Sequence, residues 1–230
     1  MVEIYATRIL ADEEFQRVRE ELLTLIPEPA RKKITAFYRM ADVQRSLFGE
    51  LLLRRVLCEK LKIRNMDLRI DFEEKGKPFI QNYPLHFNLS HSGVWVVVAF
   101  SGQPVGIDVE QIKKNRLEVA RRFFTEEEFQ NLMNTPGPER SAYFYTLWTL
   151  KESYLKAIGR GLTLSLNSFN IKTVQEEYFI DINGTFANTH LRIIPLESGY
   201  KLAVCAFEPA IRQNIILLPA GEYLSSMRSI

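Results

Sequence analysis

The sequence predicts an α+β fold in which small sheets pack on two long helices. Residues 41–61 and 139–158 carry apolar side chains at spacings of three, four and seven, which is typical of helices that cover a sheet. Residues 94–100 and 200–207 are apolar runs typical of buried strands. Both runs follow a Ser-Gly pair and end in Ala-Phe, which indicates an internal repeat. A chance match of two short apolar runs explains this echo equally well.

Alternation of apolar with polar or small residues predicts most of the strands. The first strand, for example, alternates at Val2, Ile4 and Ala6. The expected strands are residues 2–9, 67–72, 85–90, 94–100, 105–110, 169–172, 178–182, 191–194 and 200–207. Residues 215–218 and the stretch from Tyr223 onward are expected to be an adjunct to the fold.

Helices are predicted by apolar spacing and by the residues that start and stop them. Asp12 and Asp42 are the expected N-caps of the first and third helices. Pro27 and Pro29 interrupt the pattern after the first helix, and Gly159 ends the last one as a left-handed cap. The expected helices are residues 11–25, 31–38, 41–61, 116–124 and 139–158.

Composition describes an ordinary globular protein. The 230 residues are 46% hydrophobic and 25% charged, and the net charge of +2 gives no basic field that would favour nucleic acid. Cys58 and Cys205 lie in apolar runs and are expected to be buried thiols of a reducing compartment. The N-terminal residues lack the pattern of a signal peptide, and no apolar stretch is long enough to span a membrane. We therefore expect a cytoplasmic protein without membrane contact.

The stretch from Gly106 to Lys156 contains the residues that indicate chemistry. Asp108 and Glu110 are two apart on a predicted strand, so they project to the same face. Glu152 and Lys156 are four apart on a predicted helix and lie along one stripe. If the strand lies beside the helix, three carboxylates converge next to a lysine, and hard oxygen ligands at that density suit Mg²⁺.

A structural explanation exists for each fragment alone. Acidic pairs at strand ends are common, and a Glu/Lys pair four apart usually decorates a solvated helix face. The order and spacing of the fragments together, however, resemble the signature of phosphopantetheinyl transferases of the surfactin-synthetase-activating (Sfp) type. The matching segments are Gly106-Ile107-Asp108, Phe124-x-x-x-Glu128, Trp148-x-x-Lys151-Glu152-x-x-x-Lys156, Lys75-Gly76-Lys77-Pro78 and His86-Phe87-Asn88-Leu89-Ser90-His91-Ser92.

The resemblance implies two pseudo-symmetric halves, each a small sheet packed on a long helix, with the active site in the cleft between them. Residues 1–103 would form the N-terminal half, which contacts coenzyme A, and residues 104–230 the C-terminal half, which carries the metal and catalytic residues. A chain that contains both halves is expected to act as a monomer.

The resemblance also implies a reaction and its partners. The 4′-phosphopantetheine of coenzyme A is moved to a serine of an acyl or peptidyl carrier protein, which is generally an acidic helical bundle. Adenosine 3′,5′-bisphosphate is released, and the carrier is converted from its apo to its holo form. Such enzymes serve nonribosomal peptide synthesis and antibiotic biosynthesis.

The resemblance implies metal-binding and catalytic roles for a small set of residues. Asp108, Glu110 and Glu152 are the expected ligands of Mg²⁺, with Mn²⁺ as an alternative ion, and Lys156 is expected to contact phosphoryl oxygens. The base that deprotonates the serine is either Glu152 or Glu128. Glu128 also stands three residues after Thr125, the spacing of a capping box, so a structural role is equally open. Lys151 lies about 100° from Glu152 around the helix and would reach another phosphate oxygen or only solvent.

Coenzyme A contacts are expected mainly from the first half. The matching positions are Lys33, Arg45, Ser46, Lys75, Gly76, Lys77, Ser90 and His91, together with Lys156. Ala30 stands where other members carry a second lysine, which would weaken coenzyme A binding unless a neighbouring cation compensates. Trp95, Trp148 and Phe144 are expected in the core.

The sequence also allows two alternative functions. A magnesium enzyme acting on another nucleotide or pyrophosphate would use the same carboxylates, although the sequence has neither a Walker loop nor a Gly-x-Gly-x-x-Gly motif. A non-catalytic module that binds an acidic protein would use the carboxylates only structurally.

The substitution Ala30→Lys tests the predicted gap in the phosphate contacts. A restored ammonium group at this position is expected to lower the dissociation constant of coenzyme A by about tenfold, through one added charge-assisted contact. Calorimetric titration of both proteins measures the change. An unchanged dissociation constant would mean that another residue already serves the 3′-phosphate.

Overall fold

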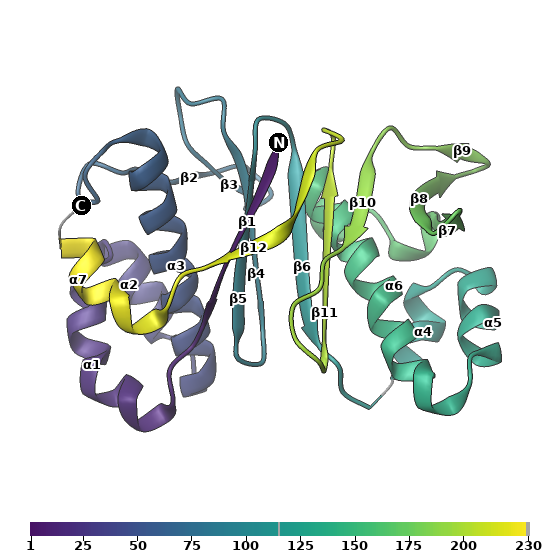
Figure 1. Cartoon of the computed structure of the whole chain (residues 1–230), viewed down its shortest axis with the longest axis horizontal. Coiled ribbons are helices and arrows are strands. Elements are labelled where there is room, and N and C mark those ends of the chain that lie inside the picture. The colour runs from purple at the N-terminus through teal and green to yellow at the C-terminus, as the bar shows by residue number, and fades with distance from the viewer. Residues whose placement is uncertain (115, 229–230) are drawn as a thin grey trace.

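Two sheets stand at the centre of the molecule with helices on both outer sides, as Figure 1 shows. The computed structural model describes residues 1–114 and 116–228. The first sheet has the order β12 (Ile211–Leu217), β1 (Val2–Arg8), β5 (Trp95–Ser101), β4 (His86–Ser92). The second has the order β6 (Val105–Gln111), β11 (Tyr200–Ala206), β10 (His190–Ile193), β8 (Glu177–Ile182), β7 (Asn170–Val174), with β9 (Thr185–Phe186) beside β8. A two-stranded ribbon joins β2 (Asp71–Phe72) to β3 (Pro78–Phe79).

The two halves repeat one order of elements. β1, α3 (Met40–Leu61), β4 and β5 make up the first half, and β6, α6 (Gly137–Ala157), β10 and β11 make up the second. In each half the first strand pairs antiparallel with the last, β1 with β5 and β6 with β11. β5 and β11 are the two apolar runs that follow a Ser-Gly pair. The α+β class and the two-half organisation are therefore confirmed.

The sheets share a core between them. Apolar side chains from β1 and β5 pack against those of β6 and β11, and Ile4, Val97, Ile107 and Val204 are all 0% exposed. Two further cores lie under the helices, one in each half. Alternation explains this arrangement, because each central strand buries one face against its helix and the other against the opposite sheet.

The end of the chain returns to the first half. β12 pairs parallel with β1, with Val2 opposite Ile211 and Ala6 opposite Leu217. α7 (Tyr223–Arg228) then lies beside the first-half helices in Figure 1, and the buried Tyr223 ring packs 5.7 Å from the Phe48 ring. The predicted boundary, which assigned 104–230 to the second half, is therefore wrong for the residues from 211 onward.

The remaining helices are α1 (Asp12–Thr24), α2 (Glu28–Thr35), α4 (Leu117–Phe123) and α5 (Glu126–Asn134). The predicted N-caps Asp12 and Asp42 are wrong, because α1 and α3 begin earlier, after Ala11 and Arg39. α6 also begins earlier than predicted, at Gly137, since proline is tolerated in the first turn of a helix. The predicted strand 67–72 is reduced to its last two residues. No helix in the described ranges is both long and apolar enough to cross a bilayer.

α6 touches β6 through backbone alone at Gly106. A Cβ atom built on Gly106 would lie 2.0 Å from the carbonyl oxygen of Ser153 and 2.4 Å from the amide nitrogen of Ala157. Because both neighbours are backbone atoms, no side chain can rotate away to admit even a methyl group. The glycine therefore sets how closely the helix approaches the strand.

Gly106→Ala is expected to lower the free energy of unfolding by about 3 kcal/mol, because the added methyl group pushes α6 off the sheet. Urea denaturation of the variant and the parent measures the difference. Gly102→Ala is the matched control, since nothing lies within 4 Å of its added Cβ. A cost that is equal at both positions would contradict the close contact.

Candidate active site

Side chains of β4 complete the free edge of β6. One edge of β6 pairs with β11, and alternate N–H groups on the other edge donate to polar side chains of β4 instead of a strand. The distances are 3.0 Å from Ile107 N to Asn88 Oδ1, 3.3 Å from Val109 N to Ser90 Oγ and 3.1 Å from Gln111 N to Ser92 Oγ. These three β4 residues are two apart in sequence and therefore share one face. We call this row of contacts the polar seam.

Asp108 and Lys156 meet at the polar seam. The Lys156 ammonium lies 2.7 Å from Asp108 Oδ1, 3.0 Å from Ser90 Oγ and 3.1 Å from the Ile107 carbonyl oxygen. Ser90 also donates to Asp108 Oδ1 at 2.9 Å. Ser90, Asp108 and Lys156 belong to separate sequence motifs, and in the structure their side chains connect β4, β6 and α6.

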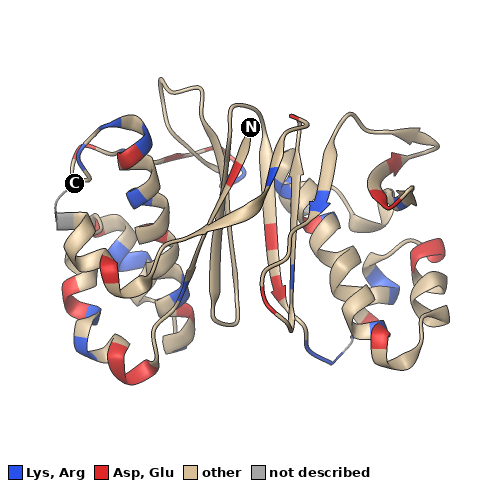
Figure 2. Ribbon diagram, in the orientation of Figure 1, with Lys and Arg blue, Asp and Glu red and all other residues tan. Residues whose placement is uncertain are grey.

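Glu110 and Glu152 lie near Asp108, and we call these three carboxylates the acidic region. Ser92 Oγ donates to Glu110 Oε2 at 2.7 Å. Burial raises the pKa of Glu110 and the charge of Asp108 raises it further, against the lowering effect of the Ser92 hydrogen bond. Burial raises the pKa of Glu152 too, and the charges of Asp108 and Glu110 add to it against Lys156. Figure 2 shows the acidic positions along β6 at the centre of the molecule.

The donor set fits a hard divalent cation. Asp108 is 4% exposed, and its Oδ2 is a buried oxygen without a hydrogen-bond partner in the described part of the chain. A buried carboxylate oxygen that lacks a partner is costly, and a cation with oxygen ligands removes that cost. Among residues 1–114 and 116–228, however, no three acidic, histidine or cysteine side chains form a ready-made metal cage. The three carboxylates occupy one region, and their oxygens do not yet converge on a point.

Arg45 brings positive charge to the same region from the first half, and His91 lies near it. Arg45 donates to the Gly93 carbonyl oxygen at 3.1 Å and pairs with Asp42 at 2.5 Å. Partial desolvation lowers the pKa of His91, and the charges of Arg45 and Lys156 lower it further. His91 is exposed, so its ring is accessible at the rim of the polar seam.

Lys77 caps the end of α6. Its ammonium donates to the carbonyl oxygens of Lys156 and Ala157, each at 3.0 Å, and burial lowers its pKa. The predicted phosphate ligand therefore ties the turn between β2 and β3 to the helix that carries Glu152. Gly76 in this turn has a φ of +81°, which favours glycine, and Lys75 is exposed beside it.

Lys33 and Ser46 lie on first-half helices. The exposed Lys33 places its ammonium 5.6 Å from the centroid of the Phe72 ring. Ser46 is partly buried on α3, one residue after Arg45. Ala30, the departure from the expected pattern, packs against the first-half core.

Glu128 and Lys151 are buried away from solvent and engage each other. Glu128 is 2% exposed and Lys151 0%, and Lys151 Nζ lies 2.9 Å from Glu128 Oε1. The capping box of Thr125 and Glu128 is confirmed. The alternatives that Lys151 reaches phosphate or solvent are wrong, because its ammonium is enclosed by protein. A carboxylate enclosed in this way has no access to the serine of another protein, so the structure does not support Glu128 as the base.

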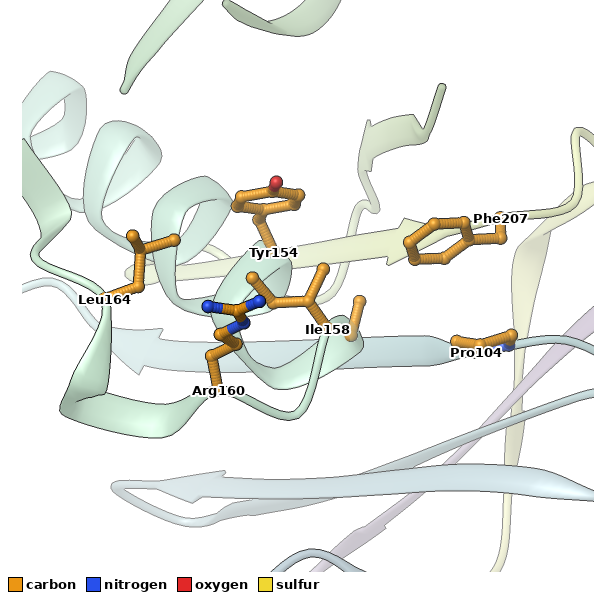
Figure 3. A pocket seen from close by; sticks show the side chains of 7 residues that line it. Pro104, Tyr154, Ile158, Arg160, Leu164 and Phe207 are labelled. Carbon is orange, nitrogen blue, oxygen red and sulfur yellow. The ribbon is translucent and has the colours of Figure 1, made fainter. Parts of the chain in front are cut away.

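Two recesses flank α6. Glu110, Lys113, Arg116, Tyr145 and Trp148 line one of about 230 Å³, which continues from the acidic region along the helix. Trp148, predicted in the core, is only partly buried and forms a wall of this recess. The other recess, of about 430 Å³, is shown in Figure 3 and is larger, but none of the predicted site residues line it. Its Tyr154 lies about 200° from Glu152 around the helix, so it opens on another side.

Asn88 and Ser92 belong to the polar seam, and the sequence motifs did not identify them as such. The alternation of Asn88, Ser90 and Ser92 with Phe87 and Leu89 was visible and indicated a polar strand face. What that face would contact depends on the packing of two sheets, which no local pattern specifies.

Glu152→Gln is expected to reveal the electrostatic cost of the acidic region. The folded-state pKa of Glu152 is raised, so its stability contribution is present below the ordinary carboxyl pKa and lost as the pH rises through the folded-state value. Without divalent cations the variant should match the parent near about pH 4 and unfold at higher urea than the parent near about pH 7. Excess Mg²⁺ at pH 7 should stabilise the parent more than the variant. Equal stabilities at both pH values would contradict the crowding of these carboxylates.

Comparison with known proteins identifies the family of the chain. Residues 104–205 match the family model described as the 4′-phosphopantetheinyl transferase superfamily, and residues 13–103 match the model described as 4′-phosphopantetheinyl transferase, N-terminal. The chain is 37% identical over 223 residues to 4′-phosphopantetheinyl transferase Sfp of Bacillus subtilis strain 168, covering 96% of this chain and 98% of that protein. It is 39% identical over 197 residues to 4′-phosphopantetheinyl transferase gsp of Aneurinibacillus migulanus, covering 84% and 83%. The chain therefore belongs to the 4′-phosphopantetheinyl transferase superfamily and is an enzyme of the transferase class.

Proposed function

We propose that this enzyme transfers 4′-phosphopantetheine from coenzyme A to a serine hydroxyl of an acyl or peptidyl carrier protein. Adenosine 3′,5′-bisphosphate is the other product, and the carriers include those of nonribosomal peptide synthesis. The observation that supports this most directly is Asp108 Oδ2, which is buried near Glu110, Glu152 and the Lys156 ammonium and has no hydrogen-bond partner among residues 1–114 and 116–228.

Asp108, Glu110 and Glu152 would hold Mg²⁺, or Mn²⁺ in its place. When bound, the ion supplies Lewis-acid chemistry on the pyrophosphate of coenzyme A. Lys156 places its ammonium group at the polar seam, where it would offset the negative charge of the transferred phosphoryl group. Because its stem comes from α6 and its partners from β4 and β6, the ammonium is held in place before substrate arrives.

Glu152 is the base in this proposal. Its carboxylate shares the electrostatic field of Asp108 and Glu110, where the serine would be bound, so it is placed to accept the serine proton. The serine oxygen forms a bond to the β-phosphorus, the bond from that phosphorus to the bisphosphate oxygen breaks, and the serine proton passes to the Glu152 carboxylate. Glu128, the other candidate, is enclosed with Lys151 and has no route to the serine.

The first half would bind the nucleotide end of coenzyme A. Its rim residues are expected to contact the phosphates, and these are Lys33, Arg45, Ser46, Lys75, Gly76, Lys77, Ser90 and His91. Arg45 and His91 already share the field of Lys156, which supports an anion at this place. Because both halves share one core within a single chain, we propose that the enzyme acts as a monomer.

Mass spectrometry of a carrier protein tests the proposal. The enzyme is incubated with an apo carrier, coenzyme A and Mg²⁺, and the carrier is expected to gain the mass of phosphopantetheine. A complex without a mass increment would identify a binding module. Breakdown of coenzyme A in the absence of carrier would identify a pyrophosphate hydrolase.

Asp108→Ala is expected to reduce this transfer by about 10²-fold or more, because it removes an oxygen donor and the partner of Lys156. The rate of carrier mass increase measures the effect, and circular dichroism checks that the fold persists. Asp67→Ala is the control, since that carboxylate is exposed and pairs only on the surface with Arg64. Unchanged turnover of the Asp108 variant would remove this residue from the metal site.

A further inference from the structure

We propose that the buried Lys151–Glu128 ion pair positions Glu152 for metal binding by fixing the rotation of α6. The proposal rests on the proposed function for the role of Glu152, and it deepens that function. Lys151 and Glu128 are thus positioning residues, which touch neither substrate nor cation.

All three donor positions of the Lys151 ammonium are used inside the protein. It donates to the Phe169 carbonyl oxygen at 2.6 Å and to the Leu166 carbonyl oxygen at 2.8 Å, and it pairs with Glu128 Oε1 at 2.9 Å. The Phe169 ring lies 4.3 Å from the same nitrogen. An ammonium with three hydrogen-bond partners in different directions holds its side chain in one orientation.

Glu128 is equally well fixed. Its Oε1 accepts from Ile171 N at 2.8 Å and its Oε2 from Thr125 N at 3.0 Å. Thr125 in turn donates to Asn170 Oδ1 at 2.5 Å. The pair therefore connects α6 to the start of α5 and to the segment from Leu166 to Ile171, all within the second half.

Stability alone does not explain a charged pair at this place. Replacing a buried ion pair by apolar residues of similar size is often neutral or stabilising, because both charges lose their hydration. An apolar contact, however, permits small rotations that directed hydrogen bonds resist. What distinguishes the Lys151–Glu128 pair from an apolar contact is thus the fixed direction of its hydrogen bonds, which resists rotation of α6.

The position of the Glu152 carboxylate depends on the rotation of α6 that these hydrogen bonds fix. It is the next residue after Lys151, about 100° around the helix, and within residues 1–114 and 116–228 no hydrogen bond orients its carboxylate. With a side chain about 5–6 Å from the helix axis, a rotation of about 10° moves the carboxylate by about 1 Å. Displacements of that size cost about 10²-fold in reactions that depend on placement. Gly106 holds α6 against β6, and Lys151 holds it from a different side.

A double-mutant comparison separates positioning from stability. The variants are Lys151→Met, Glu128→Gln and the double variant, each measured in the full chain. Urea denaturation without metal gives the free energy of unfolding, and electron paramagnetic resonance of added Mn²⁺ gives the dissociation constant of the ion. Each single variant should lose stability, because Lys151→Met leaves the Leu166 and Phe169 carbonyl oxygens without their donor and Glu128 without its countercharge, and Glu128→Gln leaves the buried Lys151 charge unpaired.

The double variant should be more stable than either single variant, since neither buried charge is left without its partner, but should bind Mn²⁺ about 10–100-fold more weakly than the parent. In the transfer reaction its kcat should fall while the KM for carrier stays unchanged. Where Lys151→Met does not fold, Glu128→Gln serves alone, because its one amide oxygen can still accept from Ile171 N, while the charge of the pair and the hydrogen bond from Thr125 N are lost.

Arg54→Met is the matched control. Arg54 is buried on α3, the equivalent helix of the first half, and pairs with Glu50 at 2.7 Å. This variant should lose stability and keep the parental Mn²⁺ affinity. Return of full Mn²⁺ affinity with stability in the double variant would overturn the proposal, as would weakened Mn²⁺ binding in the Arg54 control. Failure of the parent to modify any carrier while binding Mn²⁺ would instead count against the proposed function and leave this comparison intact.

Discussion

The arrangement of the site depends on the backbone contact between α6 and β6 at Gly106. With no side chain between them, the carbonyl oxygen of Ser153 and the amide of Ala157 lie directly on the strand. Glu152 and Lys156 each stand one residue from these contact points, so they project beside the strand at the level of Asp108. A side chain at position 106 would hold the helix further from the strand and move the Lys156 ammonium away from Asp108.

The interface between the halves has two different parts. Its centre is apolar and formed by four strands, whereas its β4 edge is polar and hydrogen-bonded through side chains. The apolar part keeps the halves in a fixed relation, and the polar part can therefore carry charged groups at a defined spacing. Lys77 adds a third connection, because it links the first half to the end of α6. The acidic region thus lies where β4, β6 and α6 meet, and contacts outside this region fix the relative positions of these three elements.

Local sequence patterns predicted those features that depend on local physics. The 3.6-residue period identified α3 and α6, continuous apolar runs identified β5 and β11, and the Thr125 capping box followed from spacing alone. The pairing of β12 with β1 was not predictable in this way, since it joins residues about two hundred positions apart.

Some charged residues of the motif are buried in the core and others lie at the acidic region, and the sequence does not show which. Lys151 and Glu152 are neighbours, yet the first is enclosed in the second-half core and the second faces the acidic region. A helical rotation of about 100° decides between the two environments, and only the packing of α6 fixes that rotation. The same reasoning accounts for Glu128, whose spacing allowed both a cap and a base, and whose buried surroundings hold it as the cap and as the partner of Lys151.

The parallel pairing of β12 with β1 has a consequence for synthesis. The first half needs residues 211–217 to complete its sheet and Tyr223 to fill its core, so it cannot finish folding while the ribosome still holds that segment. β6, α6, β10 and β11 all emerge earlier and have their strand partners among themselves. The sheet of the part of the polypeptide made first is therefore completed only by the part made last, and until then one edge of β1 has no strand partner.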